Sequence, residues 1–141
     1  MAEHTTVGEI RRVIHEAYPP QLAEPWDAVG LVCGDPTDEV STVAFALDCT
    51  QEVADKAVEL GAQMLVVHHP LLLRGVTSVA ADTPKGKVIH TLIRNGVPCW
   101  PRIPTRIKHA RVSTTSWLSS SVSSLGAPSF RWSPMRTSTR P

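Results

Sequence analysis

Apolar residues at helical spacing first appear near the amino terminus. In "VGEIRRVIHEA", residues 7–17, they recur every three or four positions, which places them on one face of a helix. Thr5 and Thr6 precede this segment and are suited to cap its amino terminus, and a proline pair would end it. The next segment, "QLAEPWDAVGLVCGDP", mixes turn residues with one short apolar stretch. We expect a loop that leads into a strand over residues 29–33.

The pattern then predicts strands and helices in alternation. "STVAFALDCT" and "QMLVVHH" each contain an apolar run of strand length, and "TQEVADKAVELG" between them has helical spacing. Thr50 is the expected N-cap of that helix and Gly61 its C-terminal cap. Residues 42–69 therefore predict a β-α-β unit with parallel, buried strands. A further helix is expected from Pro84 to the glycine at position 96.

A third strand would be expected from Val97, but the alternation stops there. Residues 98–141 contain six prolines, ten serines and three of the four tryptophans, without either period. All thirteen acidic residues, with only seven of fourteen basic ones, lie in residues 1–97, so the two parts carry formal charges of −6 and +7. We therefore predict an α/β segment over residues 1–97, the truncated amino-terminal part of a mixed or parallel sheet with flanking helices, and a low-complexity basic tail over residues 98–141, non-native or disordered.

Composition narrows the class of protein. The chain of 141 residues has the length of one domain. Its three cysteines are too scattered for a disulfide framework and suit a reducing compartment, where we expect them to be inert. The amino terminus is polar and acidic, and no apolar run approaches the ~18 residues of a membrane span. These features predict a soluble cytoplasmic protein without a membrane partner.

The candidate ligand residues lie where the two predicted parallel strands end. Asp48 follows the first strand, and His68 and His69 end the second, so all three fall at the same sheet edge, where α/β proteins bind ligands. Neutral imidazoles and carboxylates are common ligands of divalent metals. Both histidines can serve one site only if the strand ends there, which Pro70 favours. Two alternatives stay open: the histidines bond backbone groups or face solvent, and Asp48 caps the following helix.

Three further residues are candidates for contacts with a substrate or for support of the ligands. Trp26 and Asp27 could line a pocket, although Trp26 equally suits a core position. Arg74 could hold an anionic substrate, with a solvated loop cation as the alternative. The other four histidines have no partners by spacing, and we do not expect them to be ligands.

The stretches "LAEPWDAVGLVCGD", "VAFALDCT" and "GAQMLVVHHPLLLRGV", in this order, resemble the NIF-three-like family, also called "GTP cyclohydrolase 1 type 2 homolog". The resemblance covers residues 7–97 and only the first part of a typical member. It implies that His68 and His69 bind metal. Ala28 replaces the usual asparagine, which puts a role for that amide in doubt. The family's later "HTN-x-D" segment, and its carboxyl-terminal histidine and glutamate, are missing.

The first missing segment is recoverable from the genetic code. Trp100 must be encoded by TGG and Pro101 by CCN. A frame displaced by one base from these codons permits "HTNADKARPGVNDL", the family's own continuation, in place of the residues from 102 to 116. We therefore expect that one base was lost near the codons of Val97 and Pro98, and that residues 98–141 are translated out of frame. A genuine basic arm that binds nucleic acid is the alternative.

The resemblance implies a protein that binds two divalent metal ions, with zinc, iron, manganese and nickel not distinguished. It further implies a metal-dependent hydrolase that acts on a small, nucleotide-like substrate, for which GTP ring opening is the suggested reaction. The intact protein is expected to form a homo-oligomer and not to bind nucleic acid, and the truncated form is expected to be inactive. The alternative is a non-catalytic protein that binds or delivers metal through the same ligands.

Overall fold

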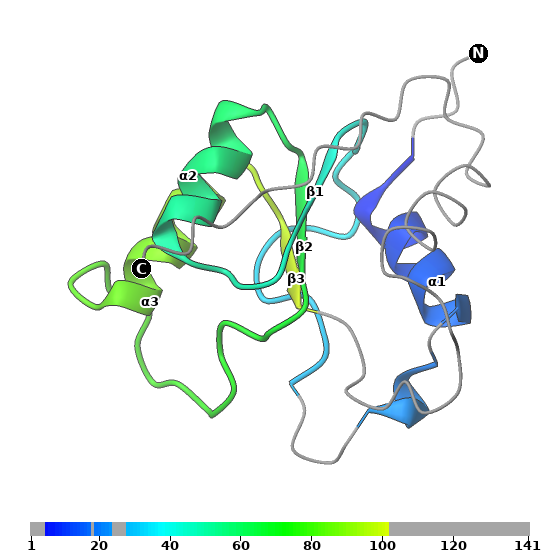
Figure 1. Ribbon diagram of the computed structural model, residues 1–141, viewed down its shortest axis with the longest axis horizontal. Coiled ribbons are helices and arrows are strands. Elements are labelled where there is room, and N and C mark those ends of the chain that lie inside the picture. The colour runs from blue at the N-terminus through cyan, green and yellow to red at the C-terminus, as the bar shows by residue number, and fades with distance from the viewer. Residues whose placement is uncertain (1–4, 18, 24–27, 102–141) are drawn as a thin grey trace, which may run out of the picture.

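The computed structural model describes residues 5–17, 19–23 and 28–101, which form an α/β fold in three layers (Figure 1). The sheet is parallel throughout, in the order β1 (Val43–Ala46), β2 (Met64–Val67), β3 (Cys99–Pro101). Two helices, α2 (Gln51–Glu59) and α3 (Pro84–Arg94), cover one face. The helix α1 (Val7–Ala17) covers the other, followed by the short 3-10 helix η1 (Pro20–Leu22). The predicted α/β class is confirmed.

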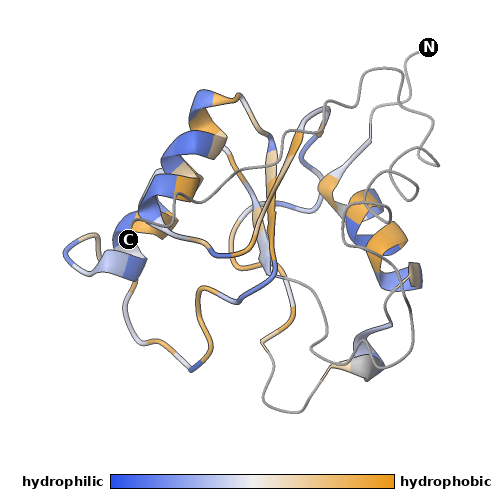
Figure 2. Ribbon diagram, in the orientation of Figure 1, coloured by the Kyte–Doolittle hydropathy of each residue, from blue (hydrophilic) through white to orange (hydrophobic). Residues whose placement is uncertain are grey.

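The central strand β2 divides the core into two halves. Leu65 and Val67 pack with the apolar faces of α2 and α3, whereas Met64 and Val66 pack with α1. All four side chains are buried, which is expected of a parallel strand covered on both faces. Figure 2 shows the same arrangement as apolar colouring along the strands and mixed colouring on the helices. The β-α-β unit predicted over residues 42–69 is therefore confirmed.

The helix boundaries follow the capping residues. The Thr6 backbone N–H donates to Oε2 of Glu9 (2.8 Å), and the Glu9 N–H donates to Oγ1 of Thr6 (3.3 Å), which together make a capping box at α1. Thr50 accepts from the Val53 N–H through Oγ1 at 3.2 Å and caps α2. The chain leaves α2 through Gly61, whose φ of 65° lies in the left-handed region that glycine tolerates best. These caps set the ends of the helices that position the candidate site.

The strand β3 corrects the expectation that no strand follows Val97. The Leu65 N–H donates to the Pro98 carbonyl at 2.8 Å, and Cys99 and Trp100 are fully buried on opposite faces of the sheet. A three-residue strand that follows one proline and ends on another has too little periodicity to be recognised, and it forms because β2 supplies its partner. The boundary predicted after residue 97 stays a prediction, because residues 102–141 lie outside the described part of the chain.

The strand expected over residues 29–33 is reduced to a single antiparallel bridge between Cys33 and Cys99. The Val32 N–H donates to the Cys99 carbonyl (2.9 Å) and the Cys99 N–H to the Cys33 carbonyl (3.0 Å). This segment therefore covers the outer edge of β3. Within the described residues, no helix is long and apolar enough to cross a membrane.

Candidate functional site

The two adjacent histidines lie directly after the end of β2. The His68 N–H donates to the Ala46 carbonyl (3.1 Å) and the His69 N–H to the Leu47 carbonyl (2.8 Å), so the β1 strand end fixes both backbones. Successive residues of a regular strand point to opposite faces. Here the strand has ended at Val67, and the two rings lie side by side, with centroids 4.8 Å apart and planes inclined by 35°. The strand therefore ends before the histidines, which is the condition that the sequence set for a site common to both rings.

Asp48 contacts the second histidine. Its Oδ1 lies 2.6 Å from Nδ1 of His69, and the two side chains are 46% and 54% exposed. Asp48 does not cap α2, because Thr50 performs that function. A carboxylate hydrogen-bonded to one imidazole nitrogen is the usual environment of a histidine whose other nitrogen binds metal. The structure thus brings Asp48, His68 and His69 together at the carboxyl ends of β1 and β2, as the strand order predicted.

The remaining predicted site residues do not join this group. Arg74 lies on the exposed loop after β2 and makes no ion pair with any described residue. Trp26 and Asp27 lie outside the described residues, as does the segment whose displaced frame would encode further ligands. Across the described ranges, no three side chains of the metal-binding types are placed to hold an ion together. The described residues therefore present at most a partial metal site.

A pocket of about 550 Å³ opens between the amino-terminal ends of α2 and α3. Cys49 and Leu71 line it and follow Asp48 and the histidines closely in the chain, although those three residues are not among its described lining residues. Lys85 and Lys87 contribute positive charge to its wall, and Asp82 contributes negative charge. Sequence reasoning missed this pocket, although two N-cap threonines on consecutive helices of one sheet face were visible in the sequence.

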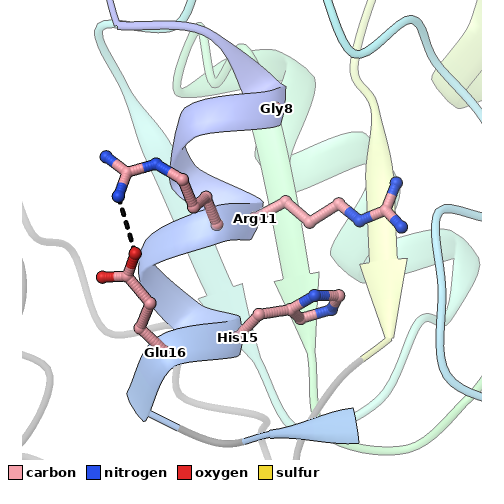
Figure 3. Close-up of a pocket in the computed structure, with 5 residues that line it drawn as sticks. Gly8, Arg11, His15 and Glu16 are labelled. Carbon is pink, nitrogen blue, oxygen red and sulfur yellow. Dashed lines mark hydrogen bonds and ion pairs between the residues drawn. The ribbon is translucent and has the colours of Figure 1, made fainter.

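A second pocket, of about 390 Å³, lies on the outer side of α1 (Figure 3). Arg12 and Glu16 form an exposed ion pair of 2.6 Å, while Arg11 and His15 point to the other side of the helix. The His15 ring contacts the buried Trp100 ring edge-on, with centroids 5.3 Å apart. This pocket belongs to the opposite layer from α2 and α3, and we assign it no part in the site.

The three cysteines are free, as predicted, but they lie closer together than their spacing indicates. Sγ of Cys49 lies 3.7 Å from Sγ of Cys99. This contact lowers the pKa of Cys49 and, with burial, raises the pKa of Cys99. Burial also raises the pKa of Cys33. Through this non-covalent contact, the loop that carries Asp48 and Cys49 packs against β3.

The sequence and the fold are similar to those of known proteins. Residues 5–100 match the profile of the family described as Duf34/NIF3 (NGG1p interacting factor 3). The "GTP cyclohydrolase 1 type 2 homolog" proteins of Mycobacterium tuberculosis and Streptomyces coelicolor are each 54% identical over 64% of this chain. The chain spans 23% and 32% of their lengths.

Staphylococcus aureus protein SA1388, a solved structure, is 36% identical with a TM-score of 0.68, over 72% of this chain and 29% of its own. The matched residues include the whole described sheet as far as Trp100. The chain therefore belongs to the Duf34/NIF3 family.

Proposed function

We propose that this chain contributes His68 and His69 to a divalent-metal site, and that the intact protein is a metal-dependent hydrolase of a nucleotide-like substrate. One observation carries the proposal: two imidazole rings lie side by side at the carboxyl end of a central parallel strand. This is the edge where α/β proteins bind ligands. The partly exposed ring of His69 is accessible to an ion.

The residues present fit a metal ion in part. The imidazoles of His68 and His69 are donor groups that zinc, iron, manganese and nickel accept, and the carboxylate of Asp48 is hydrogen-bonded to one of them. When bound, a divalent ion lowers the pKa of a coordinated water and so supplies a nucleophile for hydrolysis. The chain's own residues hold and orient that ion. Four-coordinate or larger sites need more ligands than the described residues offer.

The source of the remaining ligands is the second part of the proposal. We propose that they belong to the displaced reading frame and to the later part of the intact protein. The family match ends at residue 100, close to the codons where the frame is proposed to change, and this supports the proposal. For the chain as written we predict little or no hydrolase activity. Tight, stoichiometric binding of two metal ions by this chain alone would contradict this account of the missing ligands.

The substrate class rests on the relatives' names. The relatives are named "GTP cyclohydrolase 1 type 2 homolog", and the pocket between α2 and α3 has two lysines that suit an anionic group beside one aspartate, Asp82. We extend the proposal to a cytoplasmic homo-oligomer of the intact protein that binds no nucleic acid.

The second candidate is a non-catalytic protein that binds metal or delivers it to a partner. The family description names an interaction with NGG1p, which favours this alternative. The same histidines would then bind metal without turning over a substrate.

A frame-corrected, full-length protein loaded with Mn²⁺ or Zn²⁺ separates the two candidates. GTP turnover that is lost in His68→Ala, and kept in the control His90→Ala on α3, would establish the hydrolase. Metal-loaded protein that turns over neither nucleotides nor phosphoesters would establish the non-catalytic protein. Metal content that His68→Ala leaves unchanged would contradict both.

A further inference from the structure

We propose that Asp48 is a positioning residue, which fixes the tautomer and the ring orientation of His69 so that Nε2 is the nitrogen presented to a metal. This inference rests on the proposed metal site, and it deepens that site by assigning a role to each ring nitrogen of His69. It also assigns Asp48 a role other than that of a helix cap or a direct ligand.

The first step is the contact between the two side chains. The distance of 2.6 Å between Asp48 Oδ1 and His69 Nδ1 is that of a short, charge-assisted hydrogen bond. An ionised carboxylate only accepts hydrogen bonds, so Nδ1 must carry the proton. In a neutral imidazole the other nitrogen, Nε2, then has the free lone pair. The contact therefore determines which nitrogen of His69 is able to bind a cation.

The second step is the backbone that holds the pair in place. The His69 N–H donates to the Leu47 carbonyl at 2.8 Å, and Leu47 is the residue directly before Asp48. His69 is thus held at two points by consecutive residues, through its backbone by Leu47 and through its ring by Asp48. This arrangement follows from the parallel register, in which Ala46 lies opposite Val67. The ring is therefore hydrogen-bonded to Asp48 although more than half of the side chain is exposed.

The third step concerns the competing roles of Asp48. Thr50 supplies the side-chain cap of α2, so Asp48 is not needed there. The oxygen Oδ1 is engaged by the ring of His69, so a metal bound through that oxygen would compete with this hydrogen bond. The carboxylate is therefore placed to support the ligand, an arrangement whose removal typically costs about 10–100-fold in metal affinity.

The test compares Asp48→Asn with Glu52→Gln in the full chain. Each change replaces one carboxylate by an amide of the same shape; Glu52 is an exposed residue in the first turn of α2. The asparagine is no longer an obligate acceptor, because its amide can donate to Nδ1 instead. Long-range nitrogen–proton NMR of the imidazoles reads the tautomer without metal, and titration with Zn²⁺ reads the affinity.

We expect the Nδ1-protonated tautomer of His69 in the parent chain and in Glu52→Gln, and its loss in Asp48→Asn. The Zn²⁺ affinity should fall about 10–100-fold in Asp48→Asn. It should change less than about threefold in Glu52→Gln, whose charge is screened by solvent. An Nε2-protonated His69 in the parent chain would overturn the inference. So would a fall in Zn²⁺ affinity with the tautomer unchanged, which would make Asp48 a direct ligand. Correct tautomers in a parent chain that binds no Zn²⁺ would instead refute the proposed metal site, while leaving the contact between Asp48 and His69 established.

Discussion

Gly86, in the first turn of α3, is expected to respond to alanine in the opposite sense to most helical glycines. A Cβ at this position would lie 1.9 Å from the Ala80 carbonyl oxygen and 2.7 Å from Oγ1 of Thr83. Both atoms belong to the turn that begins α3, where Thr83 Oγ1 accepts from the Gly86 N–H and donates to the Ala80 carbonyl. A backbone oxygen at this distance cannot be avoided by a change of rotamer, so the turn must move.

The magnitude follows from the contacts that the movement breaks. Loss of the Thr83 cap costs about 1 kcal/mol. The two hydrogen bonds from Thr83 to the Ala80 carbonyl contribute roughly 0.5–1.5 kcal/mol each. The higher helix propensity of alanine offsets about 1 kcal/mol of this loss. We therefore expect Gly86→Ala to lower the free energy of unfolding by about 1–3 kcal/mol.

Urea denaturation followed by circular dichroism measures this difference, with Gly75→Ala as the matched control. A Cβ at Gly75 meets nothing within 4 Å, so the control should stay within about 0.5 kcal/mol of the parent. A Gly86→Ala protein that is as stable as the parent, or more stable, would refute the packing of residues 80–83 against α3. Because residues 81–83 line the pocket between α2 and α3, the same variant should also distort that pocket.

Three further predictions test the fold around the site. Leu92→Ala should lower the free energy of unfolding by about 2–5 kcal/mol, because Leu92 is fully buried. The control Ile93→Ala changes a residue that is 59% exposed and should have a much smaller effect in the same denaturation assay. Equal effects of the two changes would contradict the orientation of α3. Thr50→Ala should cost about 1 kcal/mol through loss of the α2 cap, measured by thermal unfolding, and an unchanged melting temperature would contradict the assigned cap. Iodoacetamide should alkylate the partly exposed Cys33 before the buried Cys49 and Cys99, as mass spectrometry would show. Because burial raises the pKa of Cys33, its alkylation rate should increase at a higher pH than that of a free cysteine. An increase at the pH of a free cysteine would contradict that burial. Native Cys33 holds its proton more tightly than Cys33 of the unfolded chain does. Its contribution to the free energy of unfolding is therefore fully present below the pKa of the unfolded chain and is lost as pH rises through the pKa of the folded chain.

Local signals explain why the helices and the first two strands could be predicted. Thr50, Gly61 and Pro84 act through their immediate neighbours, so their roles as cap or start residues are visible in the sequence. The strand β3 lacked such a local signal, because its three residues form a strand only by pairing with β2, which is distant in the sequence. Leu60 and Ile93 fit the apolar faces by spacing, but they lie at the carboxyl-terminal ends of α2 and α3 and are 40% and 59% exposed.

The candidate site was predictable in its members but not in its geometry. Parallel strand order was enough to bring Asp48 to the same edge as His68 and His69. The contact with His69 in particular depends on the register of β1 against β2, which neither strand specifies alone. The pocket between α2 and α3 depends on how the two helices pack together, which is a tertiary property.

Titration calorimetry of the chain with Zn²⁺ tests the central claim, that the adjacent histidines bind a divalent metal. The parent chain and His90→Ala should bind Zn²⁺ alike, because His90 lies within α3 and not at the end of β2. The double variant His68→Ala, His69→Ala should lose that binding while keeping its circular dichroism spectrum. No binding by the parent chain, or equal binding by the double variant, would contradict the assignment of His68 and His69 as ligands.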